Sequence, residues 1–170
     1  MCGIIGITSN KTVSSAIINS LRKLEYRGYD SAGIATLSNG VINEIKSEGR
    51  VNNLEKNLDV KNMSGTVGIG HVRWATHGIP NTVNAHPHSS EKVSIVHNGI
   101  IENSTILKKY LIGKGHIFKS QTDTEVIVHL ITEYLKVDNL KNSIIKMLKQ
   151  LHGSFALGII FKDQPDLIVG

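Results

Sequence analysis

The one cysteine of the chain stands at position 2, directly after the initiator methionine. Removal of Met1, which a small second residue permits, leaves Cys2 with a nucleophilic thiol and a free α-amine on the same carbon. An α-amine has a pKa near ~8, so part of it is neutral at cellular pH and can accept a proton. Such an amine activates a neighbouring Ser, Thr or Cys nucleophile. Position alone favours a cysteine without a chemical role. Whether Cys2 is a nucleophile therefore has to be judged from the other motifs of the sequence.

Three polar, glycine-rich segments adjoin apolar stretches that are predicted to be strands. The first is Glu25–Gly33, the second is Gly70–Gly78 followed by Asn84–His88, and the third is His97–Asn103. A rigid strand holds the loop residues next to it in place, which is where binding and catalytic side chains are often found. These segments are the candidates to complete a site around Cys2.

In order and spacing, the segments resemble those of the glutamine amidotransferases that use an N-terminal cysteine. Tyr26–Gly33, Arg73–Gly78 and His97–Asn103 are similar to the glutaminase domains (class II glutamine amidotransferases) of the glucosamine-6-phosphate synthase family. The related purine-pathway amidotransferases differ, with Gln-Glu in place of Tyr29 and Asp30. The resemblance extends over essentially all 170 residues. It implies an enzyme, the glutaminase half of an isomerizing transaminase, that hydrolyses L-glutamine and supplies ammonia to make glucosamine 6-phosphate from fructose 6-phosphate.

The resemblance assigns the reacting groups to three residues. The thiol of Cys2 attacks the side-chain amide carbon of glutamine, and its own amine carries the proton. The side-chain amide of Asn98 and the backbone N–H of Gly99 form the oxyanion hole, where each donor is commonly worth ~3–4 kcal/mol of the barrier. An Asn-Gly pair also fits a simple turn. With Cys2 present, we prefer the oxyanion role.

The amino-acid end of glutamine is assigned to a second group of residues. Arg73 offers a planar fork that suits the α-carboxylate, and Thr76 and His77 in the same loop complete that site. Asp123 holds the α-ammonium, and Trp74 belongs to a loop that closes over glutamine and gates the exit of ammonia. The alternatives are a surface charge at Arg73 and a capping role for Asp123; we prefer the ligand roles.

The eight histidines raise a rival hypothesis, a metal site. Pro87 is expected to hold the rings of His86 and His88 apart, and the chain has no His-x₃-His or Cys cluster. We therefore expect no metal and no cofactor. The remaining interpretations are structural hydrogen bonding for His71, His86 and His97, a site wall for Tyr29 and Asp30, and surface or helix-face positions for His116, His129 and His152.

Hydrophobic periodicity predicts the elements that must position these residues. Strands are expected at 3–8, 33–37, 41–45, 66–72, 93–96, 153–161 and 167–169, with a hairpin turn at Ser38-Asn39-Gly40. Helices are expected at 13–24 with Thr12 as N-cap, 104–111 with Asn103 as N-cap, 126–135 after a capping box at 122–125, and 140–151 with Leu140, Ile144, Leu148 and Leu151 on one face.

This order of elements is typical of an α+β fold rather than a regular βαβ alternation. With the resemblance, it predicts the αββα sandwich of N-terminal-nucleophile (Ntn) hydrolases: two antiparallel sheets face to face, with helices outside. We expect residues 1–170 to be a partial type-2 glutamine amidotransferase domain, with the C-terminal strands missing and the sugar isomerase domains absent. A separate chain that carries the remainder is a candidate partner. An inactive remnant and a related amidotransferase remain the alternatives.

Composition limits the other function classes. A length of 170 residues, 40% hydrophobic and 19% charged, fits one ordinary globular domain. No apolar run is long enough to cross a bilayer, and no signal peptide is recognised, so we expect no membrane association. The net charge of +5 comes mainly from dispersed lysines, so we expect no nucleic-acid binding. A single cysteine excludes an intrachain disulfide framework and suits the cytoplasm.

Overall fold

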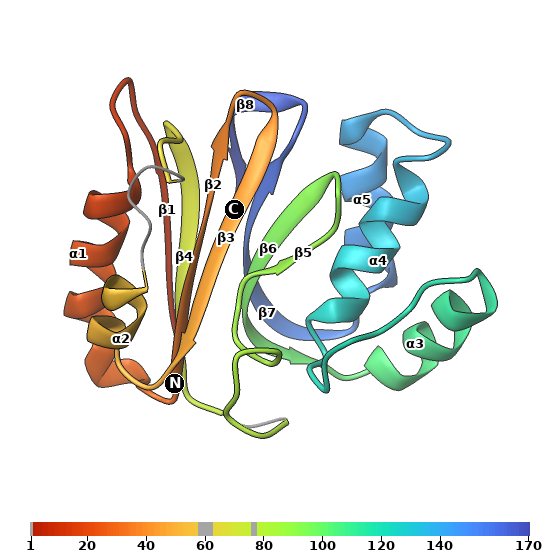
Figure 1. Ribbon diagram of the computed structural model, residues 1–170. Coiled ribbons are helices and arrows are strands. Elements are labelled where there is room, and N and C mark those ends of the chain that lie inside the picture. Colours follow the sequence, from red (N-terminus) through yellow and green to blue (C-terminus); the bar gives the residue numbers. More distant parts are fainter. Residues whose placement is uncertain (1, 58–62, 76–77) are drawn as a thin grey trace.

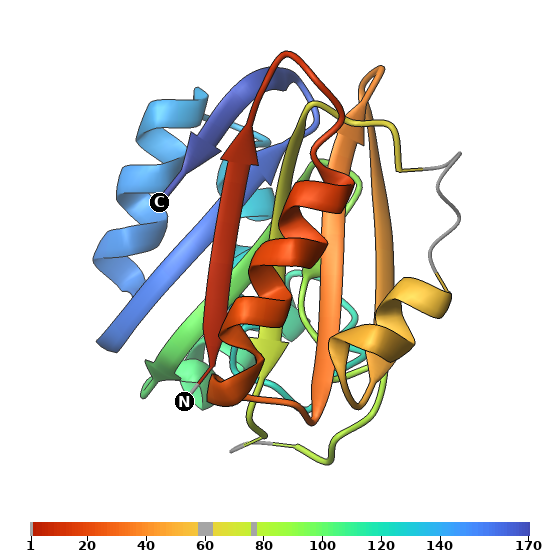
Figure 2. The same cartoon turned by 90° about the vertical axis from the view of Figure 1, so that its left-hand side faces the viewer.

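Two antiparallel four-stranded sheets pack face to face in the computed structural model, which describes residues 2–57, 63–75 and 78–170. Helices α1 and α2 cover the outer face of the first sheet, and α3, α4 and α5 lie outside the second (Figure 1). Figure 2 shows α1 lying against the face of the first sheet, roughly along its strands. The predicted α+β sandwich of antiparallel sheets is confirmed. No helix within the described residues is long and apolar enough to cross a membrane.

The first sheet brings three strand ends to one edge. Its strand order is β1-β4-β2-β3, and the register sets Gly3 opposite Val72 and Ser31 opposite Arg73. The start of β1, the end of β4 and the start of β2 are therefore neighbours, so Cys2 lies beside the segment that follows Arg73. The strands are β1 (Gly3–Thr8), β2 (Ser31–Ser38), β3 (Val41–Glu48) and β4 (Val67–Arg73).

The second sheet has the order β5-β6-β7-β8. The strand predicted at 93–96 continues to Ile101, because His97 pairs with Leu157 and Ile101 pairs with Gly153 of the next strand. The third motif is thus part of a strand rather than a loop. The strands are β5 (His88–Ser89), β6 (Val93–Ile101), β7 (Gly153–Phe161) and β8 (Gln164–Val169).

The four predicted helices are confirmed, and two short helical segments were not predicted. One of these, α2, has only six residues, of which Val51 and Leu54 are buried, which is too short to show a helical period. The other is a 3₁₀ helix at Glu25–Arg27. The α-helices are α1 (Ser14–Leu24), α2 (Val51–Lys56), α3 (Ser104–Gly113), α4 (Glu125–Tyr134) and α5 (Leu140–Gln150).

Apolar side chains fill three layers. Ile17 and Leu21 of α1 are fully buried against the first sheet, and Ile127 and Ile131 of α4 are fully buried against the second. Each buried side chain of this size contributes about 1.5–3 kcal/mol. The layer between the two sheets contains Ala35, Leu37, Val67, Ile69, Val96 and Ile160.

One of the predicted helix caps is wrong, and a second has the predicted position but forms no capping hydrogen bond. Helix α1 begins with Val13 at the N-cap, so Thr12 does not cap it. Asn103 does occupy the N-cap of α3, but no side-chain capping bond forms. Its amide nitrogen donates to the Gln150 carbonyl at 2.7 Å, and its oxygen accepts from the His152 N–H at 3.0 Å. This side chain ties α3 to the start of β7 because those contacts compete with capping.

Two details of α4 and α5 also differ from prediction. Residues 122–125 form no capping box, because α4 begins at Glu125 with Thr124 as its N-cap. On α5, the stripe that includes Leu148 is displaced: Leu148 is 41% exposed, while Ser143 and Met147 are fully buried. Which face of α5 is buried depends on where α4 and the second sheet pack against it. The hydrophobic periodicity of the sequence does not give that position.

We predict that Glu125→Gln destabilises the fold. The buried Glu125 carboxylate accepts from the Lys119 N–H at 2.8 Å and from the Ser120 N–H at 2.6 Å. Burial acts to raise the pKa of Glu125, but hydrogen bonds from His129, Lys119 and Ser120 lower it to about 2. Hydrogen bonds to a charged group contribute about 1.5–3 kcal/mol, so urea unfolding at pH 7 should show a loss of roughly 2–3 kcal/mol.

The matched control is Glu102→Gln on the exposed surface. Surface changes of this kind stay within about 0.5 kcal/mol. Equal stabilities for the two variants would show that the Glu125 contacts do not anchor the loop to α4.

Candidate active site

Cys2 is held by groups from three separate segments. Its carbonyl oxygen accepts from Arg27 Nε at 2.9 Å and from Asn98 Nδ2 at 3.2 Å. Its sulfur accepts from the backbone N–H of Trp74 at 3.2 Å. The side chain remains partly exposed. The residue that carries the proposed chemistry is thus fixed in direction and still open to a substrate.

A backbone N–H and a guanidinium lie near the sulfur. The Trp74 N–H points at it, and Arg73 is close enough for the two groups to interact electrostatically. Gly28 allows this arrangement, since a Cβ there would lie 2.6 Å from the Arg73 carbonyl carbon and 2.7 Å from the Trp74 nitrogen. A side chain at position 28 would displace the segment that supplies the donor.

Asn98 and Gly99 lie in the middle of β6, opposite Ala156 and Phe155 of β7. Gly99 has φ +122°, and a Cβ at this position would collide with the Ser154 carbonyl oxygen, so only glycine fits. The NH₂ group of Asn98 faces Cys2, as a donor to a developing oxyanion must. The simple-turn alternative for this Asn-Gly pair does not apply, because both residues are in a strand.

Arg73 and Asp123 line the same cavity as Cys2. Burial lowers the pKa of the Arg73 guanidinium, while Cys2, Asp30 and Asp123 act to raise it, and arginine stays charged at neutral pH. One oxygen of Asp123 accepts from the Ile101 N–H at 2.7 Å, which fixes the carboxylate at the end of β6. A cation and an anion facing one cavity can pair with the carboxylate and ammonium of an amino acid.

The remaining predicted site residues divide into two groups. Trp74 is 45% exposed at the rim, with its ring 5.6 Å from that of Tyr29. Asp30 accepts from the Ala75 N–H at 2.8 Å, which supports its interpretation as part of the wall. Thr76 and His77 lie outside the described residues.

Four buried histidines form a layer at the cavity, and three of them, His71, His86 and His97, are part of its lining. The ring of His86 lies 4.3 Å from that of His71, 4.9 Å from that of His88 and 6.4 Å from that of His97. The expectation that Pro87 separates His86 and His88 is wrong: the His86–Pro87 peptide is cis and the rings contact each other. Within residues 2–57, 63–75 and 78–170, no three His, Cys, Asp or Glu side chains group to hold a metal ion.

Threonine hydroxyls form hydrogen bonds with three of these rings. Thr124 Oγ1 lies 3.2 Å from His86 Nε2 and 2.8 Å from His97 Nδ1, and Thr122 Oγ1 lies 3.0 Å from His88 Nε2. Both threonines flank Asp123. The histidines thus hydrogen-bond as expected, and they support the segment that carries the anionic side of the site.

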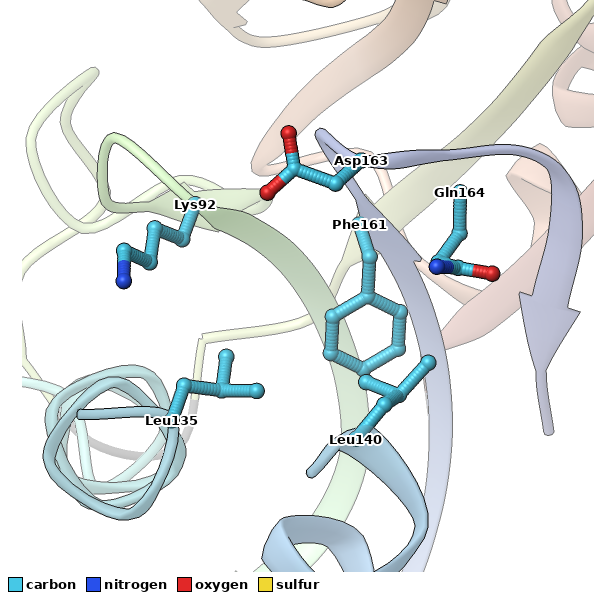
Figure 3. Close-up of a pocket in the computed structure, with 6 residues that line it drawn as sticks. All are labelled: Lys92, Leu135, Leu140, Phe161, Asp163 and Gln164. Atoms are coloured by element: carbon cyan, nitrogen blue, oxygen red, sulfur yellow. The ribbon is translucent and has the colours of Figure 1, made fainter. Parts of the chain in front are cut away.

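The described residues form further hollows, and two of them are compared with the site around Cys2. One, of about 480 Å³, opens on the other side of Cys2 and Gly99 and includes Arg27 and Phe155 in its lining. The other, of about 160 Å³, lies between the end of α4, the start of α5 and the β7–β8 turn (Figure 3). Phe161 in its wall pairs with Val93, at the opposite end of β6 from Gly99, so this second hollow is remote from Cys2.

The sequence did not predict the contacts of Arg27, His116 and His129. Arg27 was included only within a motif, although its place beside Tyr29 and Asp30 was a signal. His116 and His129 were expected at the surface or on a helix face, but their Nδ1 atoms lie 3.1 Å apart. The other nitrogen of His116 lies 2.9 Å from Glu133 Oε2. These two side chains are largely buried because the loop after α3 packs against α4.

Comparison with known proteins agrees with this geometry. A family described as "Glutamine amidotransferase domain" matches residues 71–170. The glutamine–fructose-6-phosphate aminotransferase (isomerizing) of Mesorhizobium japonicum is 52% identical and covers 100% of this chain, and that of Clostridium acetobutylicum is 51% identical and covers 99%. The chain spans 28% of the length of either relative.

Solved structures agree as well. The glutamine phosphoribosylpyrophosphate amidotransferase of B. subtilis, solved with ADP and GMP, superposes with a TM-score of 0.83 at 29% identity, over 95% of this chain and 35% of that one. A structure described as the allosteric regulatory enzyme of purine biosynthesis has the same TM-score and identity and covers 95% of this chain and 36% of that one. These matches confirm the Ntn-hydrolase type of the fold.

We predict that stability falls as the pH drops from about 7 to 5. Burial lowers the pKa of His71 and that of His88 to about 3 each. Unfolded histidine titrates near ~6.5, so below that pH the unfolded chain binds protons that the folded chain rejects. Each imidazole should remove up to about 1.4 kcal/mol per pH unit, measurable by urea unfolding at a series of pH values.

His88→Gln provides the comparison, because it removes one of the titrating rings. Its stability should depend less steeply on pH between 7 and 5. A parent protein with equal stability at both pH values would contradict the burial of neutral histidines.

Proposed function

The chain belongs to the family of glutamine amidotransferase domains, and we propose that it hydrolyses the side-chain amide of L-glutamine with Cys2 as the nucleophile. The support is one arrangement: a thiol, a guanidinium and a carboxylate line a single cavity at the edge of the two sheets. The cation and anion suit the two charges of an amino acid. The thiol and the nearby N–H donors suit attack on its amide.

The reaction follows from the groups around Cys2. After loss of Met1, the α-amine takes the thiol proton and the sulfur attacks the amide carbon, forming a C–S bond. The carbonyl oxygen becomes an oxyanion that Asn98 Nδ2 and the Gly99 N–H stabilise. The amine passes its proton to the amide nitrogen, the C–N bond breaks, and ammonia leaves a glutamyl thioester.

A water molecule completes the cycle. The amine of Cys2 takes a proton from the water, and the oxygen attacks the thioester carbon through a second oxyanion at the same donors. The C–S bond breaks, glutamate leaves, and the proton returns to the sulfur. Asn98 Nδ2 has two hydrogens, so it can serve the oxyanion while it still donates to the Cys2 carbonyl.

The substrate is oriented by its charged end. Arg73 binds the α-carboxylate through its two-pronged guanidinium, and Asp123 accepts from the α-ammonium. Thr76 and His77, which the family resemblance adds, complete the carboxylate site. Trp74 at the rim closes over bound glutamine and directs the ammonia outward, which agrees with its exposure beside the sulfur.

The ammonia serves the synthesis of glucosamine 6-phosphate from fructose 6-phosphate. Supporting this assignment are the names of relatives that are about half identical along the chain. The matched chain spans only 28% of those relatives, so the sugar step belongs to sugar isomerase domains on the same or a separate chain. A cytoplasmic location suits a single reduced thiol.

We predict that Cys2 is the sole site of labelling by a glutamine-like diazo ketone. The chain has no other cysteine, so Cys2→Ala should abolish both the labelling and the release of glutamate, as read by intact mass and a glutamate assay. Labelled protein should lack Met1, because a peptide bond to Met1 removes the catalytic amine. Labelling that persists in Cys2→Ala, or glutamate release that is absent from the parent chain, would contradict the proposed function.

We predict that Arg73→Ala and Asp123→Ala each weaken glutamine binding by about 30-fold or more. Truncating one partner of a buried charge pair commonly costs ~2–5 kcal/mol. Alkylation of Cys2 by iodoacetamide, which needs no amino-acid site, should proceed at nearly the parent rate. The control is Arg50→Ala, whose side chain is 70% exposed; it should bind glutamine like the parent. An unchanged KM in Arg73→Ala would rule out the assignment.

A further inference from the structure

The amide of Asn98 has two orientations of similar shape, because a half turn about its last bond exchanges oxygen and nitrogen. Only one of them presents hydrogens to the oxyanion. The reaction therefore depends on what holds the NH₂ group toward Cys2 rather than away from it.

Both ends of this amide face partners of fixed character. Nδ2 lies 3.2 Å from the Cys2 carbonyl oxygen, which can only accept. Oδ1 lies 3.0 Å from Nε2 of His71. The carbonyl therefore requires the nitrogen on the Cys2 side, and the oxygen of the amide then requires a donor at His71.

His71 is able to donate from that nitrogen. Nε2 also lies 3.1 Å from the His97 carbonyl oxygen, a second group that can only accept, so the proton must be on Nε2. Burial lowers the pKa of His71 to about 3, so at neutral pH the ring carries one proton. Among the described residues, Nδ1 faces no hydrogen-bond partner. A buried acceptor without a partner is less costly than a buried N–H without one, so an unprotonated Nδ1 fits this position.

The ring has little freedom to turn. His71 is fully buried in β4 of the first sheet and reaches across to Asn98 in the second. Its face packs against His86 at 4.3 Å, and His86 is in turn held by Thr124. The donor thus comes from the opposite sheet, and its ring is held by His86 and by the His97 carbonyl.

We infer that His71 is a positioning residue of the hydrolysis: its Nε2–H holds Asn98 Oδ1 and so keeps the Asn98 NH₂ group toward Cys2. This role rests on the proposed function, since it matters only where Asn98 stabilises an oxyanion. It predicts that His71 acts on the rate through Asn98 and has little effect on the binding of glutamine, which Arg73 and Asp123 carry.

The test is a double-mutant cycle on glutamate release. His71→Leu removes the group that orients the donor, and kcat should fall by roughly 10- to 100-fold, less than the ~10²–10³ typical of removing an oxyanion donor itself, while KM changes by less than about threefold. His71→Gln carries an NH₂ group near the position of Nε2 and should restore most of kcat. In an Asn98→Ala background, His71→Leu should cause no further loss, because the two residues act as one unit.

The control is His116→Leu, which removes another largely buried imidazole, one that contacts His129 and Glu133 rather than any group of the site. When the two proteins are compared at the same concentration of folded protein, the kcat of this variant should stay within about threefold of the parent value. Distant sites rarely interact strongly, so their effects add. Additive losses for His71→Leu and Asn98→Ala, or a kcat of His71→Gln as low as that of His71→Leu, would overturn the inference.

A second measurement needs no variant and no turnover. Imidazole ¹⁵N shifts of the parent protein should show His71 with its proton on Nε2 and no titration between pH 5 and 9, as burial of a neutral ring requires. A proton on Nδ1 would leave Nε2 as an acceptor and refute the inference, even if glutamine is hydrolysed. A parent chain that releases no glutamate would refute the proposed function while the tautomer still tests the geometry.

Discussion

The carbonyl oxygen of Cys2 is the point on which the site depends. A chain terminus normally frays, because few contacts hold its backbone. Here Arg27, which follows α1, and Asn98, which lies in the opposite sheet, both donate to that one oxygen. A terminal residue held from both sides has a thiol and an amine with fixed directions. The remaining parts of the site can be understood as groups arranged around this fixed point.

Charge is distributed unevenly around the site. The ionic groups Arg73 and Asp123 line the cavity together with imidazoles that burial keeps neutral. Neutral rings provide donors and acceptors without adding positive charge next to Arg73. The charge in the cavity therefore comes from Arg73 and Asp123, and the imidazoles contribute hydrogen bonds and packing.

The sequence contained most of the site and much of the fold, but not the contacts between elements. Asn39 and Gly40 adopt positive φ values in the predicted hairpin turn, because local backbone preference decides such turns. Motif order also predicted that Cys2, Arg73, Gly99 and Asp123 come together, and these residues line one cavity. The capping box failed because the Glu125 carboxylate binds a loop outside its helix. The extension of β6 was missed because polar residues there pair with β7, which only tertiary structure reveals.

Gly99 has a consequence for assembly of the second sheet. Its α-carbon faces the Ser154 carbonyl where no Cβ fits, and its neighbours Asn98 and Ile100 both carry side chains. A slip of β6 by one residue would bring one of those side chains against β7. It would also move every side chain of β6 to the opposite face of the sheet. Gly99 therefore helps to fix the register of β6 against β7. Steric exclusion disfavours mispaired strands, so Asn98 and Gly99 reach their places beside Cys2 only when β6 and β7 are correctly aligned.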